Sequence, residues 1–290
     1  MLAGGKGTRL YPATYSVNKH LLPIYDKPMI YYPLSVLMLA GIRDILIIST
    51  PQDTDRFRKV LGDGSYLGIR LQYEVQNEPR GIADAFVVGS HFVGDGPVAL
   101  ILGDNFFFGH GLPDILRQRK REVEERGGAC IFAYYVQDPS AYGVVEFDSD
   151  WRVISIEEKP ENPRSNYAIT GLYFFDGNVV DIAASISPSD RGEKEITDIL
   201  KAYLERNALR VQVLGRGFAW LDMGTHDSML EASVFVSTIE KRQGLKIGCI
   251  EEVAYRMGWI DRDGLLKVAR RYSNSGYGDY LRRLAEGRII

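Results

Sequence analysis

The sequence has very little cysteine: only Cys130 and Cys249 occur among 290 residues, and there is no Cys-x-x-Cys pair. Two cysteines so far apart argue against a disulfide framework and a zinc site, and they fit a reducing compartment. We expect both to be small buried hydrophobic side chains. Histidine is also scarce, and the four that occur have no metal-ligand spacing: His20, His91, His110 and His226.

Long apolar runs and an excess of basic charge are absent as well. No apolar stretch reaches the roughly 20 residues that cross a bilayer, and no signal-peptide pattern is seen. The formal net charge is −3, whereas nucleic-acid-binding domains normally have a strong basic excess. We therefore expect a cytoplasmic protein that binds neither membranes nor nucleic acid. The hydrophobic content of 45% is enough for a sizeable core.

Short apolar runs alternate with helical patterns in the first half of the chain. Strands are predicted over residues 44–49, 70–75, 97–103 and 129–136, and helices over 28–40, 81–93 and 112–126. This alternation predicts a parallel sheet with helices on both faces. A buried first strand usually has about five residues, yet only Met1 and Leu2 precede Ala3. We expect either a misassigned start codon or a trimmed chain.

The pattern changes beyond residue 140. Short strands over 144–147, 153–156 and 168–175 predict an antiparallel addition, followed by helices over about 177–185 and 195–206. Thr225 can cap a helix that runs to about Gln243, where Gly244 would end it. We predict an α/β fold: a Rossmann-like mixed, mainly parallel central sheet flanked by helices, with a small antiparallel part and a helical C-terminal segment. One domain is expected over 1–290, with a catalytic core over about 1–225 and the helical segment over about 226–290.

A glycine-rich loop, G-G-K-G-T-R at residues 4–9, follows the first strand. Glycines let backbone N–H groups approach phosphate oxygens, and Arg9 can place a forked guanidinium on them. The spacing matches neither the dinucleotide fingerprint nor the Walker A pattern, so an ordinary strand-to-helix turn is the alternative. Lys19 lies ten residues beyond Arg9. It either neutralises charge on a leaving pyrophosphate or is a solvated surface lysine.

Two aspartates are candidate metal ligands. Asp104 follows Gly103 at the carboxyl end of an apolar strand, where open α/β sheets bind ligands. Asp222 lies between apolar residues, and a partly buried carboxylate needs a partner. Together with phosphate oxygens the pair would suit Mg²⁺. For Asp104, the alternative is a helix cap or turn-former.

A third group of candidates lies in the predicted antiparallel part. In Y-G-V-V-E at 142–146, Gly143 would let a sugar ring approach the backbone. In E-E-K-P at 157–160, Glu158 could accept hydrogen bonds from sugar hydroxyls, and Lys159 could bind a sugar phosphate as a point charge. The alternative is a hairpin with a charged edge.

Taken in order, these motifs resemble those of the sugar-nucleotidyltransferase family. G-G-K-G-T-R-L, K-H-L-L-P, L-G-D-N, Y-G-V-V-E, E-E-K-P and W-L-D-M-G-T all occur, and the match covers essentially the whole chain. It is closest to the thymidylyltransferases of that family, through I-Y-Y-P-L-S-V-L-M-L-A-G-I, S-N-Y-A-I-T-G-L-Y-F-F-D, G-T-H-D-S-M-L-E-A and S-G-Y-G-D-Y-L. The departures are Met223, where threonine is usual, and Lys6, where a small residue is common.

The resemblance implies a role for each matching residue. Nucleotide binding would fall to Leu2, Gly4, Gly5, Gly7, Thr8, Arg9, Gln76 and Gly81, with Gln76 and Gly81 holding the thymine ring. The sugar phosphate would be surrounded by Tyr142, Gly143, Glu158, Lys159 and Tyr173, in the antiparallel sugar-binding part. Mg²⁺ would be held by Asp104 and Asp222, and catalysis would rest on Arg9, Lys19 and Lys159. An end-product site between the subunits of a homotetramer would include His110, Arg216, Glu252 and Arg256.

The implied reaction is thymidylyl transfer from dTTP to glucose 1-phosphate, which yields dTDP-glucose and pyrophosphate. A phosphomonoester is largely dianionic at neutral pH, because its second pKa is about 6, so the nucleophile needs no general base. Two alternatives remain open at this point. One is a uridylyl-, cytidylyl- or adenylyltransferase acting on a related sugar phosphate. The other is a non-catalytic regulatory subunit that binds sugar nucleotides.

Overall fold

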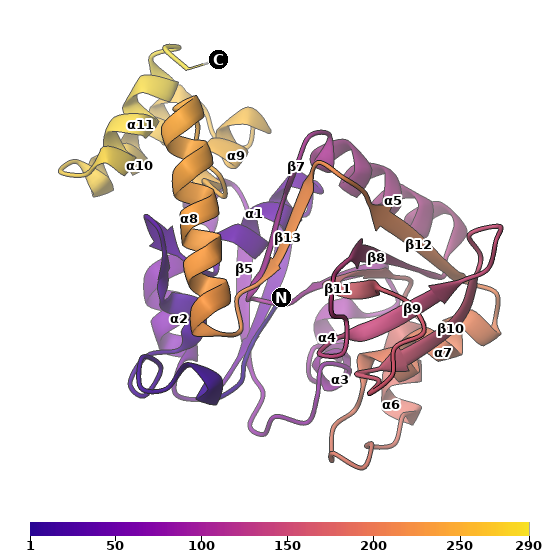
Figure 1. Ribbon diagram of the computed structural model, residues 1–290. Coiled ribbons are helices and arrows are strands. Elements are labelled where there is room, and N and C mark those ends of the chain that lie inside the picture. Colours follow the sequence, from indigo (N-terminus) through magenta and orange to yellow (C-terminus); the bar gives the residue numbers. More distant parts are fainter. Residues whose placement is uncertain (290) are drawn as a thin grey trace.

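A parallel three-stranded sheet forms the first part of the fold, which is described here from a computed structural model for residues 1–289 (Figure 1). Its order is β1 (Leu2–Ala3), β4 (Asp44–Ser49) and β5 (Arg70–Val75), and all neighbours run parallel. Helices α1 (Tyr31–Leu39) and α2 (Thr54–Leu61) make the crossovers between them. The bounds predicted for β4 and β5 are confirmed.

A six-stranded mixed sheet continues the first one. Its order is β10 (Val153–Glu158), β9 (Gly143–Phe147), β11 (Tyr167–Phe175), β8 (Ala129–Tyr135) and β12 (Leu209–Leu214), and β6 (Val98–Ile101) also pairs with β11. Only β8 and β12 are parallel in this sheet. A parallel bridge between Leu2 and Leu102 joins the two sheets. The strand predicted over 97–103 therefore has a parallel neighbour in β1 and an antiparallel one in the long strand β11.

Two apolar cores lie on opposite faces of these sheets. Because side chains alternate along a strand, Ile45 and Ile47 of β4 join one core, and Leu46 and Ile48 join the other. The first core includes α1 and α5 (Leu112–Arg126). The second includes α3 (Asp84–Val88), α6 (Val179–Ser185) and α7 (Ile196–Glu205). The predicted class, an α/β fold with a parallel sheet and flanking helices, is confirmed.

Several elements differ from the prediction in their bounds. The helix expected from Pro28 begins at Tyr31, because β3 (Lys27–Pro28) pairs with β2 (Pro23–Ile24) as a short ribbon. The helix expected over 81–93 is divided into α3 and α4 (Ser90–Val93) at Gly89. Besides β2 and β3, three strands were missed: β12, and the antiparallel pair β7 (Asn105–Gly109) and β13 (Phe218–Asp222). The apolar runs of β7 and β13 do not alternate in polarity, so pattern alone cannot distinguish them from other buried segments. The sequence of β12 does alternate, with Leu209, Val211 and Val213 apolar and Arg210 and Gln212 polar.

The chain beyond residue 225 is helical, as expected. The Thr225 hydroxyl accepts a hydrogen bond from the Ser228 N–H at 3.2 Å, and Gly244 has φ 72°, so α8 (His226–Gln243) begins and ends where predicted. It leads to α9 (Ile250–Arg256), α10 (Arg262–Ala269) and α11 (Gly276–Ala285), which gather at its far end in Figure 1. In the part of the chain that the structure describes, no helix is long and apolar enough to span a membrane. The single domain over 1–290 stays a prediction.

Candidate active site

The glycine-rich loop leaves β1 and enters a short 3-10 helix at Thr8–Leu10. Gly5 and Gly7 have φ values of 93° and 60°, in the left-handed region that glycine adopts without strain. The Thr14 hydroxyl donates a hydrogen bond to the Gly7 carbonyl at 2.7 Å and holds the turn. Gly5 and Thr8 are exposed, so this part of the loop is accessible to a ligand.

Gln76 follows β5 and lies against the glycine loop. A β-carbon on Gly4 would be 3.6 Å from its Oε1 atom and 3.9 Å from Leu2. The Gln76 Nε2 atom donates to Asp84 Oδ2 at 2.9 Å, and Gly81 is close enough for its carbonyl to lie 3.5 Å from Nε2. Parallel strands carry ligand-binding groups at their carboxyl ends. The structure therefore brings together the residues expected to hold the nucleotide base.

Gly81 is held against the backbone at residue 194. Its φ is 100°, and a β-carbon there would lie 2.3 Å from the Lys194 carbonyl oxygen. No side chain fits in that space. The glycine is therefore required by the close approach of two backbone segments next to Gln76.

The two predicted metal ligands meet where the β7–β13 ribbon leaves the sheet. Asp104 precedes β7, Asp222 ends β13, and Asp222 is paired in register with Asn105. The Met223 N–H donates to the Asp104 carbonyl at 2.9 Å and fixes the end of the ribbon. The Lys19 ammonium forms an ion pair with the Asp104 carboxylate.

The pKa values of the two carboxylates are shifted in opposite directions. Burial favours the neutral form of Asp104, but the Lys19 charge outweighs burial and holds the Asp104 pKa well below its usual range. Burial raises the pKa of Asp222 to about 6, and the negative charge of Asp104 adds to this rise. The positive charges of Lys19, Arg9 and Lys159 each lower the Asp222 pKa, but burial and the Asp104 charge outweigh them.

This donor set fits Mg²⁺. Magnesium is usually bound by one or two carboxylates together with substrate phosphates and waters, rather than by an all-protein cage. Residues 1–289 contain no cluster of three or more His, Cys, Asp or Glu that could hold a metal alone. A divalent ion at Asp104 and Asp222 would favour the charged form of both carboxylates.

Arg9 reaches this site across Gly224. A β-carbon on Gly224 would lie 2.8 Å from the Arg9 Nη2 atom and 3.3 Å from Asp222 Oδ2. The guanidinium and the carboxylate thus face each other across a position that has no side chain. Arg9, the last residue of the glycine loop, thus lies next to one carboxylate of the Asp104–Asp222 pair.

The hairpin of β9 and β10 forms the other side of the site. Gly143 is paired with Glu158, and the Lys159 N–H donates to the Tyr142 carbonyl at 3.0 Å. Lys159 has φ 42°, in the left-handed region that few non-glycine residues adopt. Its ammonium is 3.7 Å from Glu158 Oε1. A β-carbon on Gly143 would be 3.0 Å from Thr197, so the backbone is open there only because the residue is glycine.

Two aromatic residues complete the predicted sugar-phosphate set. The Tyr142 ring packs edge-on against Trp220, with ring centroids 5.0 Å apart. Tyr173 is buried in β11. Burial raises the Tyr173 pKa far above its usual range, and the nearby charges of Glu158 and Asp104 raise it further. Its hydroxyl is therefore neutral and able to donate a hydrogen bond.

Sequence reasoning missed three residues that shape the site. Arg191 donates hydrogen bonds to Glu158 Oε1 at 3.3 Å and to Glu195 Oε2 at 2.8 Å. The Thr197 hydroxyl donates to Glu158 Oε2 at 3.1 Å. The Asn105 amide oxygen accepts from Trp220 Nε1 at 2.6 Å and from the Gly171 N–H at 2.9 Å. The only sequence signal for Arg191 was the spacing of four residues between Arg191 and Glu195, which is typical of an ion pair on a helix.

The predicted end-product residues form two separate pairs. His110 and Arg216 flank the end of the β7–β13 ribbon, where Gly109 is paired with Phe218. Glu252 and Arg256 lie one turn apart on α9 and form an ion pair of 2.7 Å. No hydrogen bond or ion pair within residues 1–289 links the two pairs, and their role stays a prediction.

Known proteins share this sequence over almost its full length. The family model for nucleotidyl transferases matches residues 1–239. A glucose-1-phosphate thymidylyltransferase of Mycolicibacterium smegmatis is 56% identical over 286 residues, which cover 99% of this chain and 98% of that protein. One of Neisseria meningitidis is 53% identical over 284 residues, which cover 98% of each.

Solved structures share the fold. A Bacillus anthracis protein assigned as a glucose-1-phosphate thymidylyltransferase, in complex with sucrose, matches with a TM-score of 0.74 at 38% identity, over 81% of this chain and 92% of that one. A UDP-glucose pyrophosphorylase complexed with UDP-glucose matches with a TM-score of 0.71 at 25% identity, over 83% and 97%. Fold and site together define a nucleotidyltransferase. The chain belongs to the nucleotidyl transferase family and, within it, to the group of glucose-1-phosphate thymidylyltransferases.

Proposed function

We propose that this enzyme transfers the thymidylyl group of dTTP to α-D-glucose 1-phosphate with Mg²⁺, giving dTDP-glucose and pyrophosphate. One observation carries the proposal: Asp222 lies within range of the charges of Asp104, Lys19, Arg9 and Lys159. Arg9 belongs to the glycine loop, and Lys19 begins a short 3-10 helix at Lys19–Leu21. Asp104 and Asp222 lie at the β7–β13 ribbon, and Lys159 directly follows β10. Charges from separate parts of the fold thus converge on one carboxylate, as a reaction between two polyanions requires.

In the proposed reaction, a phosphate oxygen of glucose 1-phosphate attacks the α-phosphorus of dTTP. The new P–O bond forms as the bond to the β-phosphate breaks, and pyrophosphate leaves in line with the attack. The nucleophile is already dianionic at neutral pH, so no side chain has to remove a proton. Bound at Asp104 and Asp222, Mg²⁺ would neutralise phosphate charge and align the phosphates.

The side chains of the site have separate tasks in this proposal. Gln76 would read the thymine ring through its amide, which can both donate and accept. Arg9 and Lys19 would bind the triphosphate and stabilise the charge that develops on the leaving pyrophosphate. Lys159 would hold the sugar phosphate, and Glu158 would accept hydrogen bonds from sugar hydroxyls. Arg191 and Thr197 keep the Glu158 carboxylate in place.

A second candidate is uridylyl transfer, which is favoured by the match to the UDP-glucose pyrophosphorylase at 25% identity. The relatives at 53–56% identity favour thymidylyl transfer. Pyrophosphate release should be measured with glucose 1-phosphate, Mg²⁺ and each nucleoside triphosphate in turn, and we expect dTTP to be the best substrate. A preference for UTP would replace the proposal by the second candidate. No release with any triphosphate would leave only a binding protein.

The Asp104→Asn variant tests the metal site in the same assay. It removes the negative charge that would hold Mg²⁺, and we expect turnover to fall by about 10²-fold or more. Asp114→Asn, at an exposed carboxylate on α5, is the matched control and should keep full turnover. Full turnover of a folded Asp104→Asn enzyme would remove Asp104 from the proposed site.

We further propose that the enzyme is a cytoplasmic homotetramer, with an end-product site that includes His110, Arg216, Glu252 and Arg256. Two large apolar side chains on α8, Leu230 and Val234, are 63% and 57% exposed and lie one turn apart. Such a pair supports a contact with another subunit.

A further inference from the structure

Asp84, the first residue of α3, carries a buried carboxylate next to the residues expected to hold the nucleotide base. It is only 7% exposed. Within residues 1–289 its side chain forms no ion pair and one hydrogen bond, which Gln76 Nε2 donates to Oδ2 at 2.9 Å. Burying a charge with so few partners is costly. Stability alone therefore does not favour an aspartate at this position.

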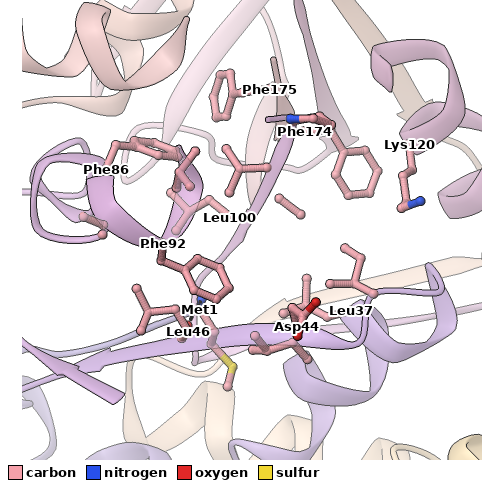
Figure 2. Close-up of a pocket in the computed structure, with 18 of the residues that line it drawn as sticks. Met1, Leu37, Asp44, Leu46, Phe86, Phe92, Leu100, Lys120, Phe174 and Phe175 are labelled. Carbon is pink, nitrogen blue, oxygen red and sulfur yellow. Dashed lines mark hydrogen bonds between the residues drawn. The ribbon is translucent and has the colours of Figure 1, made fainter. Parts of the chain in front are cut away.

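The residues on both sides of Asp84 in the chain hold it in a fixed place. Phe86, two residues further along α3, lines the mainly apolar pocket shown in Figure 2. Its ring packs edge-on against Phe175, with ring centroids 5.3 Å apart. Directly before Asp84, the Ala83 N–H donates to the Lys194 carbonyl at 3.2 Å. Core packing and a backbone hydrogen bond thus prevent Asp84 from moving with its partner.

The hydrogen bond to Asp84 determines which atom of the Gln76 amide is free. An ionised carboxylate only accepts hydrogen bonds, so the amide must turn its Nε2 atom toward Asp84. The Gly81 carbonyl, another acceptor, lies 3.5 Å from the same Nε2 atom. The Oε1 atom faces the glycine loop, where a β-carbon on Gly4 would be 3.6 Å away. Within the described residues Oε1 accepts no hydrogen bond, so Gln76 presents a free acceptor on that side.

The pyrimidine bases differ in the atom that such an acceptor would meet. Proteins read a base by hydrogen bonds to its pairing edge. Thymine and uracil carry a hydrogen on N3 and can donate it to an amide oxygen, whereas the N3 atom of cytosine is itself an acceptor. A site built to pair with a donor rejects a ligand that lacks it, because a buried polar group is left unpaired. The orientation of the Gln76 amide therefore decides between thymine or uracil and cytosine.

We propose that Asp84 is a positioning residue for base selection, which holds the Gln76 amide so that Oε1 accepts the N3–H of thymine or uracil and cytosine is rejected. The inference rests on the proposed role of Gln76 in base binding. An asparagine of the same shape would remove the constraint, because its amide can donate to Oε1 as well as accept from Nε2. The Gln76 amide could then turn and offer Nε2 to cytosine. The acceptor-only chemistry of Asp84, and not its size alone, is thus what selects the base.

The test measures the dissociation constants of dTTP and dCTP with Mg²⁺ by calorimetry, without sugar phosphate so that no transfer occurs. We expect the wild-type enzyme to bind dTTP about 10²-fold or more tightly than dCTP, and Asp84→Asn to reduce this ratio by about tenfold or more. Asp55→Asn, at an exposed aspartate in the first turn of α2, is the matched control and should keep the wild-type ratio. The same ratio in Asp84→Asn as in the wild-type enzyme would overturn the proposal.

Steady-state kinetics distinguishes base selection from a structural role. The deoxyribose separates the base from the α-phosphorus, so Asp84→Asn should raise KM for dTTP while kcat stays within about threefold of the wild-type value. A large loss of kcat with an unchanged preference for dTTP over dCTP would assign Asp84 to the fold alone.

Failure of the proposed function has a different signature in these measurements. If UTP proves to be the better substrate, the same comparison is made between UTP and CTP, because uracil carries the same N3–H. If no triphosphate is turned over, the binding ratio still decides whether Asp84 selects the base.

Discussion

Gly224 is the residue that lets Arg9 and Asp222 face each other. Nothing in the sequence marks it as special, because the motif W-L-D-M-G-T only shows a glycine before a helix cap. Its backbone is not in the left-handed region, so alanine can adopt its conformation. The constraint is steric: a β-carbon would lie 2.8 Å from the guanidinium. Three-dimensional proximity of residues 9 and 224 is what sequence spacing cannot show.

We expect Gly224→Ala to lower kcat/KM by about tenfold or more, since small misplacements of charged groups at a reacting centre are costly. Stability should change by less than about 1 kcal/mol, because the backbone is compatible with alanine. Steady-state kinetics and urea unfolding measure the two effects. Gly215→Ala is the matched control, since a β-carbon there meets nothing within 4 Å. Equal kcat/KM in both variants would mean that the Arg9 position is not critical.

The residues of the candidate site differ in how well the sequence predicts them. Asp104, Lys159 and the glycine loop belong to motifs with a chemical signature, and the structure brings them together. Asp84 and Asn105 act on other site residues through hydrogen bonds across 8 and 115 positions of sequence. Such contacts depend on the fold and have no local pattern.

At the scale of elements, α8 is the segment whose ends are best predicted by the sequence. Thr225 and Gly244 are typical cap residues, and both have the expected geometry. The β7–β13 ribbon was missed because its short apolar runs have no periodicity of their own, whereas the alternation of Leu209, Val211 and Val213 with Arg210 and Gln212 does indicate β12. The antiparallel pairing of β6 with β11 depends on residues 71 to 77 positions later in the chain, so alternation of strands and helices could not predict it.

Thr225→Ala should destabilise the protein by about 1 kcal/mol, the usual cost of losing an N-cap side chain. The change leaves the Ser228 N–H without its partner at the start of α8. Thr238→Ala, an exposed threonine in the same helix, is the control and should change stability by less than about 0.5 kcal/mol. Urea unfolding of the two variants gives the comparison. A cost for Thr238→Ala equal to that for Thr225→Ala would argue against capping.

Strand β1 makes stability depend on pH through the Met1 amine. Its pKa is lowered to about 5 in the folded state from 8.0, so between these values the unfolded chain binds more protons. Stability should therefore fall as the pH decreases from about 8 to about 5. This group contributes at most about 4 kcal/mol to the fall, at about 1.4 kcal/mol per pKa unit. Above about pH 8 the amine is neutral in both states and contributes no change.

Urea unfolding between pH 5 and pH 8 measures this dependence. The buried His20 acts in the same direction below about pH 6.5, because burial lowers its pKa to about 3. The chain acetylated at the Met1 amine serves as the reference, since it has an amide where the amine was and keeps His20. We expect the chain with the free amine to lose more stability than this reference over the range. Identical pH profiles would show that the amine is not buried in solution.

At the scale of the whole molecule, the candidate active site lies where three parts of the fold meet. The parallel strands supply the glycine loop and Gln76, the hairpin supplies Lys159, and the β7–β13 ribbon supplies Asp222. Helix α8 begins directly after this ribbon, and in Figure 1 it extends away from the site toward α9–α11. A contact made on α8 by another subunit would therefore be continuous with the segment that holds Asp222.

The exposed pair Leu230 and Val234 makes the assembly testable. If α8 is part of a subunit contact, light scattering should give a mass of four times 32.6 kDa. Two glutamates at these positions would place repelling charges in an apolar contact. We therefore expect L230E/V234E to reduce the mass to that of a dimer or monomer.

Ile154→Glu, at a side chain of similar exposure on β10, should leave the mass unchanged. A tetramer that persists in L230E/V234E would place the contact elsewhere. A wild-type monomer would contradict the homotetramer itself and leave the end-product residues without the interface they require.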